Sequence, residues 1–180
     1  MKKLLLVFLV IILTQFTGCI IFNNVFYEVS MNDDGTGSVL VTIEDINSDA
    51  TTKEDLDADV KNVLDYGYKS TDFIDDMSKD GKKITMRNLV VENGRLNAIG
   101  RYDFDDISKV EGMQYDDPYF YLTIPPDDSI MSTNGQVTRT KEYQRIIWDK
   151  SMKTLKFRMY SDDTNKKGLT SLAPYFLKEK

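Results

Sequence analysis

Two runs of alternating residues near the start of the chain flank a turn rich in Asp and Gly, and this pattern limits the fold more than any other feature. The first run places Val25, Tyr27 and Val29 at every second position. The second run, after the turn at 32–37, repeats the pattern from Val39. An apolar residue at every second position is typical of a strand with one buried face. The sequence therefore predicts a β-hairpin.

A helical period follows the hairpin. Thr51 and Glu54 have the spacing of a capping box, in which each side chain satisfies a backbone amide of the first turn. The apolar residues that follow recur at i, i+4, i+7 and i+8: Leu56, Val60, Val63 and Leu64. Gly67 is a helix-ending residue. We expect one amphipathic helix here.

Further strands are predicted over the rest of the chain. They cover 68–77, 82–91, 95–104, 118–124, 130–138, 142–149 and 153–160. Asn93-Gly94 is a two-residue hairpin signal, and a short helix is expected after Asp105. Strands joined by hairpins need one covered face. The predicted fold class is therefore α+β, a mostly antiparallel sheet (hairpin, helix, meander) packed on one amphipathic helix and forming a single domain over 25–160.

The N-terminus has the pattern of a secretory signal. Lys2 and Lys3 precede the apolar run Leu4–Leu13, which small and polar residues follow. A stable membrane-spanning helix needs roughly 20 apolar residues, so this run is too short to be one. We expect residues 1–18 to be a cleaved signal peptide.

Phe16-Thr17-Gly18-Cys19 resembles the bacterial lipobox. The resemblance implies that Cys19 becomes the lipidated first residue of the mature chain, with residues 19–24 as lipidated Cys and short tether. Acyl chains such as palmitate would then hold the protein in the cell envelope, on the outer membrane facing the periplasm in a diderm host. The alternative is that Cys19 is an ordinary small buried residue. An exported protein rarely leaves such a thiol unpaired.

Composition removes several classes of function. The chain has no His and one Cys, which excludes His-dependent catalysis, His-ligated metals and internal disulfides. The net charge is −6 and becomes −8 once Lys2 and Lys3 are lost with the signal. An acidic exported domain without a nucleic-acid-binding motif is not expected to bind nucleic acid. We also expect no cofactor and no metal, and residues 161–180 read as a polar tail.

The order of elements resembles the LppM-type bacterial lipoprotein domain over about residues 20–112. The signatures are Gly35, Gly37, Gly67 and Phe104. The resemblance implies a lipoprotein of uncharacterised activity, with binding of lipid or envelope glycolipid as one expectation.

Carboxylates are the first candidates for chemistry. The Asp-Gly turn does not fit a calcium loop, because placing Gly35 at loop position 6 puts Ser30 and Val41 at the terminal ligand positions. A hairpin turn explains it better. The paired acids are Asp75/Asp76, Asp105/Asp106, Asp116/Asp117 and Asp127/Asp128. Such pairs more often mark solvated loops than the two facing carboxylates of a hydrolase.

Aromatic and basic strand faces are the second candidates. If Leu122 and Ile124 face inward, Tyr119 and Tyr121 lie on the opposite face, where their rings can stack on a sugar or line a lipid groove. Lys156 and Arg158 are likewise expected to face outward, either toward anionic lipid or as partners of the acidic part of the domain. These four residues are the predicted ligand or membrane face.

Taken together, the sequence predicts a membrane-anchored envelope lipoprotein that is not an enzyme and binds lipid, glycan or protein. A structural subunit of an envelope assembly is the alternative, and a carboxylate-based hydrolase is a more remote one. No catalytic residues are proposed.

Overall fold

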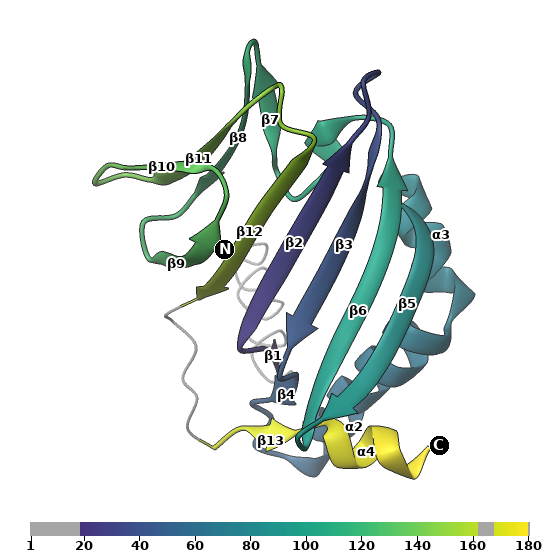
Figure 1. The fold of residues 1–180 in the computed structure, drawn as a ribbon. Helices are drawn as coiled ribbons and strands as arrows, with labels where there is room; N and C mark the ends of the chain where they lie inside the picture. The colour runs from purple at the N-terminus through teal and green to yellow at the C-terminus, as the bar shows by residue number, and fades with distance from the viewer. Residues whose placement is uncertain (1–18, 162–167, 180) are drawn as a thin grey trace, which may run out of the picture.

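The computed structural model describes residues 19–161 and 168–179, and the predicted signal peptide lies outside them. The described residues form three antiparallel sheets. The largest is six-stranded, in the order β5 (Lys83–Glu92), β6 (Arg95–Phe104), β3 (Gly37–Glu44), β2 (Asn24–Met31), β12 (Thr154–Ser161) and β9 (Asp128–Thr133). Figure 1 shows it as the broad twisted layer at the centre of the molecule.

Two smaller sheets complete the strands. One has the order β10 (Gln136–Arg139), β11 (Gln144–Asp149), β8 (Tyr119–Ile124) and β7 (Gln114–Asp116). The other joins β1 (Ile20–Ile21), β4 (Asn47–Ser48) and β13 (Thr170–Ser171).

The helices gather on one side. They are α2 (Lys53–Lys61), the π-helical segment η1 (Asn62–Lys69), α3 (Thr71–Lys79), the 3₁₀ turn η2 (Ile107–Lys109) and α4 (Ala173–Lys178). In Figure 1, α2 and α3 lie behind the sheet at the β5–β6 edge, and α4 crosses below them. We call the face that the helices cover the inner face.

The expected hairpin is confirmed, because β2 and β3 pair with Val29 opposite Val39. The β5–β6 hairpin also forms at Asn93-Gly94, where both residues have positive φ, as the twist of a two-residue hairpin requires. A β-rich α+β fold is therefore correct.

The prediction of one amphipathic helix is not confirmed. Residues 53–79 form three successive helical segments, and α3 occupies most of the predicted strand 68–77. Ser70 explains the difference, since its side chain accepts a hydrogen bond from the Asp72 amide and starts a new helix. Phe73 and Met77 then fall one turn apart on the same helical side.

Two predicted boundary segments also differ from the structure. Residues 20–21, expected in the tether, form β1, and the expected polar tail contains β13 and α4. The reason is burial: Leu172 and Phe176 are 1% and 3% exposed and pack with Leu64 and Leu96 in one core cluster. A second, larger cluster lies between the six-stranded sheet and the β10–β7 sheet, with Trp148 and Phe157 among its buried members.

Candidate functional site

A cavity of about 660 Å³ lies between the inner face of the six-stranded sheet and the segments η1 and α3. Its floor comes from alternate positions of neighbouring strands, among them Val41 on β3 and Gly100 on β6, which are directly paired. Its wall includes Tyr66 on η1 and Phe73 on α3. We call this cavity the apolar groove, because apolar side chains dominate its lining.

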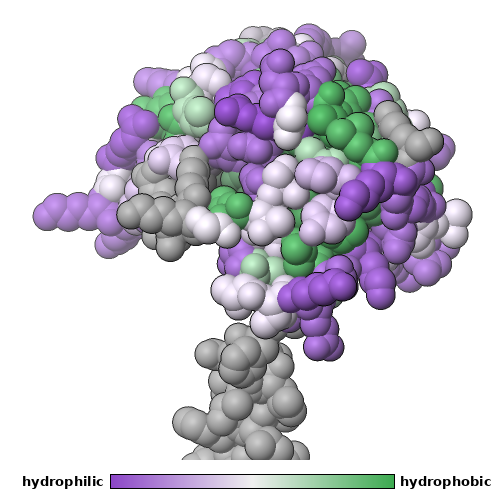
Figure 2. Space-filling view, turned by 90° about the horizontal axis from the view of Figure 1, so that it is seen from below, coloured by the Kyte–Doolittle hydropathy of each residue, from purple (hydrophilic) through white to green (hydrophobic). Residues whose placement is uncertain are grey.

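The rim of the apolar groove carries exposed hydrophobic side chains. Ile20, Phe22, Met86 and Tyr66 all line it and are 37–42% exposed. Seen from below, the molecule shows green hydrophobic side chains in separate patches among hydrophilic ones (Figure 2). Exposed apolar residues that gather around an apolar cavity mark a binding site more often than isolated ones do.

One end of the apolar groove is polar. Tyr102 is 3% exposed, and its hydroxyl has no hydrogen-bond partner among the described residues. Burial raises the pKa of both Tyr102 and Tyr27 above the usual value, and the nearby charge of Glu111 adds to the effect. Glu111 is itself paired with Lys82, at 2.9 Å between carboxylate and ammonium. Both phenols therefore stay neutral and can act as hydrogen-bond donors at physiological pH.

Arg87 on β5 fixes the helical wall. Its guanidinium donates to three carbonyl oxygens at the end of η1: those of Gly67 at 3.1 Å, Lys69 at 3.1 Å and Ser70 at 2.7 Å. These carbonyls end a helical segment and have few other donors within it. Residues of the eight-residue segment η1 line the groove, and π-helical geometry is rare and frequently found at functional sites.

The chain entering the fold is fixed beside the apolar groove. The Cys19 amide donates to Asp49 Oδ1 at 2.5 Å, and the Asp49 amide donates to the Cys19 carbonyl at 3.2 Å. Ile20 and Ile21 then pair with β4. Cys19 itself is exposed.

The structure separates the four residues of the predicted ligand or membrane face. Tyr119 and Tyr121 lie on β8, in the four-stranded sheet, while Lys156 and Arg158 lie on β12 of the six-stranded sheet. Tyr119 is 47% exposed, and the Arg145 guanidinium lies over the Tyr121 ring at 4.6 Å.

Lys156 and Arg158 point away from the apolar groove and have acidic partners. Lys156 pairs with Glu28 and Arg158 with Glu44, each at 2.9 Å. Arg158 also donates to Asn24 Oδ1 at 3.1 Å and lies over the Phe26 ring. Much of the positive charge of this face is therefore balanced within the sheet.

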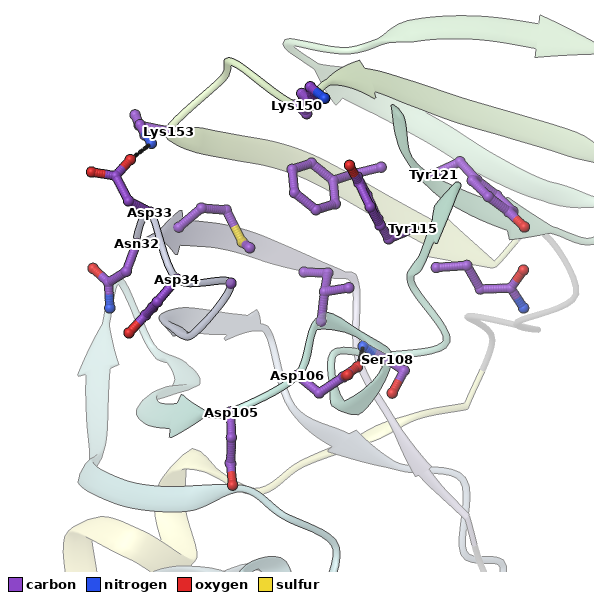
Figure 3. A pocket seen from close by; sticks show the side chains of 15 residues that line it. Asn32, Asp33, Asp34, Asp105, Asp106, Ser108, Tyr115, Tyr121, Lys150 and Lys153 are labelled. Carbon is purple, nitrogen blue, oxygen red and sulfur yellow. Dashed lines mark hydrogen bonds and ion pairs between the residues drawn. The ribbon is translucent and has the colours of Figure 1, made fainter. Parts of the chain in front are cut away.

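A second, acidic cavity of about 840 Å³ lies around the β2–β3 turn (Figure 3). Its carboxylates point in different directions, and three of them have local partners: Asp33 pairs with Lys153, Asp34 accepts from Thr36, and Asp106 accepts from the Ser108 amide. Among the described residues no group of three acids or thiols could hold a metal ion. Asp34 thus stabilises the turn and Asp106 starts η2, the kinds of role that the sequence suggested.

Sequence reasoning did not find the apolar groove, because its floor and wall come from segments far apart in the chain. Phe73 and Met77 were a usable signal, since their i, i+4 spacing after the capping residue Ser70 marks a helix with an apolar side. Gly100 gave no signal alone, because only the register shows that it faces the groove.

Comparisons of the chain with protein-family models, with curated proteins and with solved structures find no match. No helix in the described part of the chain is long and apolar enough to cross a membrane.

Proposed function

We propose that this protein is a membrane-anchored envelope lipoprotein whose folded domain binds an apolar ligand in the apolar groove. The single observation that carries the binding proposal is the groove itself, a 660 Å³ apolar cavity with exposed hydrophobic side chains on its rim. Ligand sites of soluble proteins are concave and mostly apolar, and typically enclose about 300–1,000 Å³. The described residues that line the groove are mostly aliphatic and aromatic, which supports a binding role.

The anchor is proposed from the sequence. The lipobox-like segment ending at Cys19, with the exposure of Cys19 at the edge of the fold, supports lipid attachment there. In a diderm host we expect the protein on the outer membrane, facing the periplasm. Cys19→Ser should release the protein from the membrane fraction and prevent the mobility shift of processing. Normal processing and sedimentation with membranes would contradict the anchor.

Gly100→Phe tests the groove. A Cβ at Gly100 meets only the Met86 carbonyl oxygen, at 3.8 Å, so the backbone accepts a side chain while the ring fills the cavity. The soluble domain with Cys19→Ser should bind a fluorescent fatty acid, and Gly100→Phe should abolish that binding. Arg101→Phe is the matched control, because it adds the same ring one residue away on the exposed opposite face of β6.

Chain length gives a second readout of the same proposal. Each buried methylene contributes about 0.8 kcal/mol, which corresponds to roughly fourfold in affinity. Unlabelled fatty acids or alcohols of increasing length should displace the probe, and their affinity should rise by that factor for each added methylene until the groove is full. Equal affinities across the series, or equal binding by Gly100→Phe, would reject the groove as an apolar ligand site.

A structural role in an envelope assembly is the second candidate. It is favoured by large hydrophobic side chains that are exposed outside the apolar groove: Tyr115, Tyr119 and Met131 are 47–52% exposed. Such side chains on strands near a sheet edge are suited to protein contacts. If the protein instead binds a glycan through Tyr119 and Tyr121, the glycan would occupy this same surface.

A further inference from the structure

The mouth of the apolar groove adjoins the residue that we expect to carry the lipid. Ile20 and Phe22 line the groove, and Cys19 directly precedes Ile20. Consecutive Cα atoms are about 3.8 Å apart, so the anchor and the groove lining are one peptide unit from each other. The apolar rim must therefore lie close to wherever the acyl chains of Cys19 enter a membrane.

The chain between anchor and domain has little slack. Cys19 exchanges two hydrogen bonds with Asp49, Ile20 and Ile21 pair with β4, and the Asn23 amide donates to the Glu44 carbonyl at 2.8 Å. A flexible stalk would let the domain move away from the surface. Here the backbone is bonded to the fold from Cys19 onward, which keeps the mouth at the bilayer.

The exposed rim suits the interface of a bilayer. Ile20 and Phe22 are 37% and 40% exposed, and apolar side chains beside a lipid anchor enter the boundary between headgroups and acyl chains. Inside the mouth, the floor continues along β6 from Ala98 to Gly100 and Tyr102, a rise of about 13 Å over four residues. The groove is thus long, apolar and open beside the membrane surface.

We propose that the occupant of the apolar groove is an acyl chain of a lipid from the anchoring membrane, which enters directly from the bilayer past Ile20 and Phe22. This inference rests on the proposed function and adds the source of the ligand and its route. A ligand dissolved in the surrounding water would not need the mouth to lie beside the anchor.

The test compares lipid entry with and without a stalk. The lipidated full chain is placed in phosphatidylcholine and phosphatidylglycerol vesicles that contain a trace of phosphatidylcholine with a photoactivatable acyl chain. Cross-linked residues are then identified by mass spectrometry. We expect cross-links at groove residues such as Val41 and Phe73, and their loss in Gly100→Phe.

A ten-residue Gly/Ser insertion between Cys19 and Ile20 then detaches the mouth from the anchor. Cross-linking inside the groove should fall roughly tenfold, because the effective concentration of bilayer lipid at the mouth falls. The matched control carries the same insertion between Asn93 and Gly94, in an exposed turn away from the groove, and should cross-link like the unmodified chain. Both insertion variants should still bind the fluorescent fatty acid from solution.

The other outcomes are distinct. Equal cross-linking with and without the stalk would overturn direct entry while leaving ligand binding intact. A different result is expected if the acyl chain of Cys19 itself fills the groove. The lipidated protein in detergent will then fail to bind the soluble probe, Cys19→Ser will bind it, and vesicle lipid will not cross-link. That result also overturns the proposal. Absence of probe binding in every form would instead reject the proposed function.

Discussion

Gly37 has no room for a side chain in the six-stranded sheet. It begins β3 directly opposite Phe104 of β6 and Met31 of β2. A Cβ on Gly37 would lie 2.2 Å from the Ser30 carbonyl oxygen and 2.6 Å from the Phe104 ring. Gly37 and Phe104 fit together because the Phe104 ring occupies the space that a side chain at position 37 would need.

We expect Gly37→Ala to lower the free energy of unfolding by about 1–3 kcal/mol, since the ring and the backbone of Ser30 must both move. Gly100→Ala is the control, because its Cβ makes only an ordinary contact and the substitution restricts the unfolded chain. Urea denaturation measures both. Equal stability of the two variants would show that the Phe104 ring moves aside without cost.

At the scale of elements, Arg87 holds the end of η1 against β5. Three charge-assisted hydrogen bonds from one guanidinium need the planar, forked donor set of Arg, which the single ammonium of Lys lacks. The same group lies 6.0 Å from the Phe73 ring, so it also contacts the beginning of α3. This one side chain therefore links β5 to both helical segments of the groove wall.

Arg87→Met should destabilise the domain by about 1.5–3 kcal/mol and weaken ligand binding, because the carbonyls of Gly67, Lys69 and Ser70 lose their donor. Arg87→Lys should recover only part of the loss. Hydrogen exchange of η1 amides distinguishes a local from a global effect. Unchanged exchange in Arg87→Met would mean that water replaces the guanidinium.

How far the sequence predicts elements depends on whether their signals are local. Asn93-Gly94 specifies its hairpin because positive φ at two successive residues is a property of those residues alone. The sequence of residues 68–77 predicts a strand and the structure has a helix, because that helix depends on the cap at Ser70 and on packing over a sheet whose strands come later in the chain. The sequence likewise does not predict that Phe176 is buried. Its neighbours in the core, Leu64 and Leu96, are far away in the chain.

At the scale of the whole molecule, charged side chains link the strands of the six-stranded sheet on its outer face, the face opposite the inner one. Arg158 on β12 contacts Asn24 on β2 and Glu44 on β3, which are 134 and 114 residues away in the chain. The hydrogen bond from Asn24, followed by the bond and charge of Arg158, holds the pKa of Glu44 below its usual value. The ionised carboxylate is thus favoured by folding.

Stability should therefore depend on pH through Glu44. Its folded pKa is lowered, so its contribution is present above the ordinary Glu pKa of about 4.3 and is lost as pH falls through the folded value. We expect Glu44→Gln to lower the free energy of unfolding at pH 7 by under about 1 kcal/mol, because the pair is partly exposed. The difference from wild type should shrink in urea titrations at acid pH. An exposed acid, tested as Glu92→Gln, should show a smaller effect at pH 7.

The pairing of β1 and β13 with the same strand β4 sets a condition on how the protein matures. β1 begins at Ile20, whereas β13 and the core residues Leu172 and Phe176 lie about 150 residues further along the chain. Without Leu172 and Phe176, Leu64, Leu89 and Leu96 lose part of the core cluster that buries them. The domain therefore completes this core only once residues 170–176 have joined it, and a chain truncated before residue 170 should expose Leu64, Leu89 and Leu96 to proteolysis.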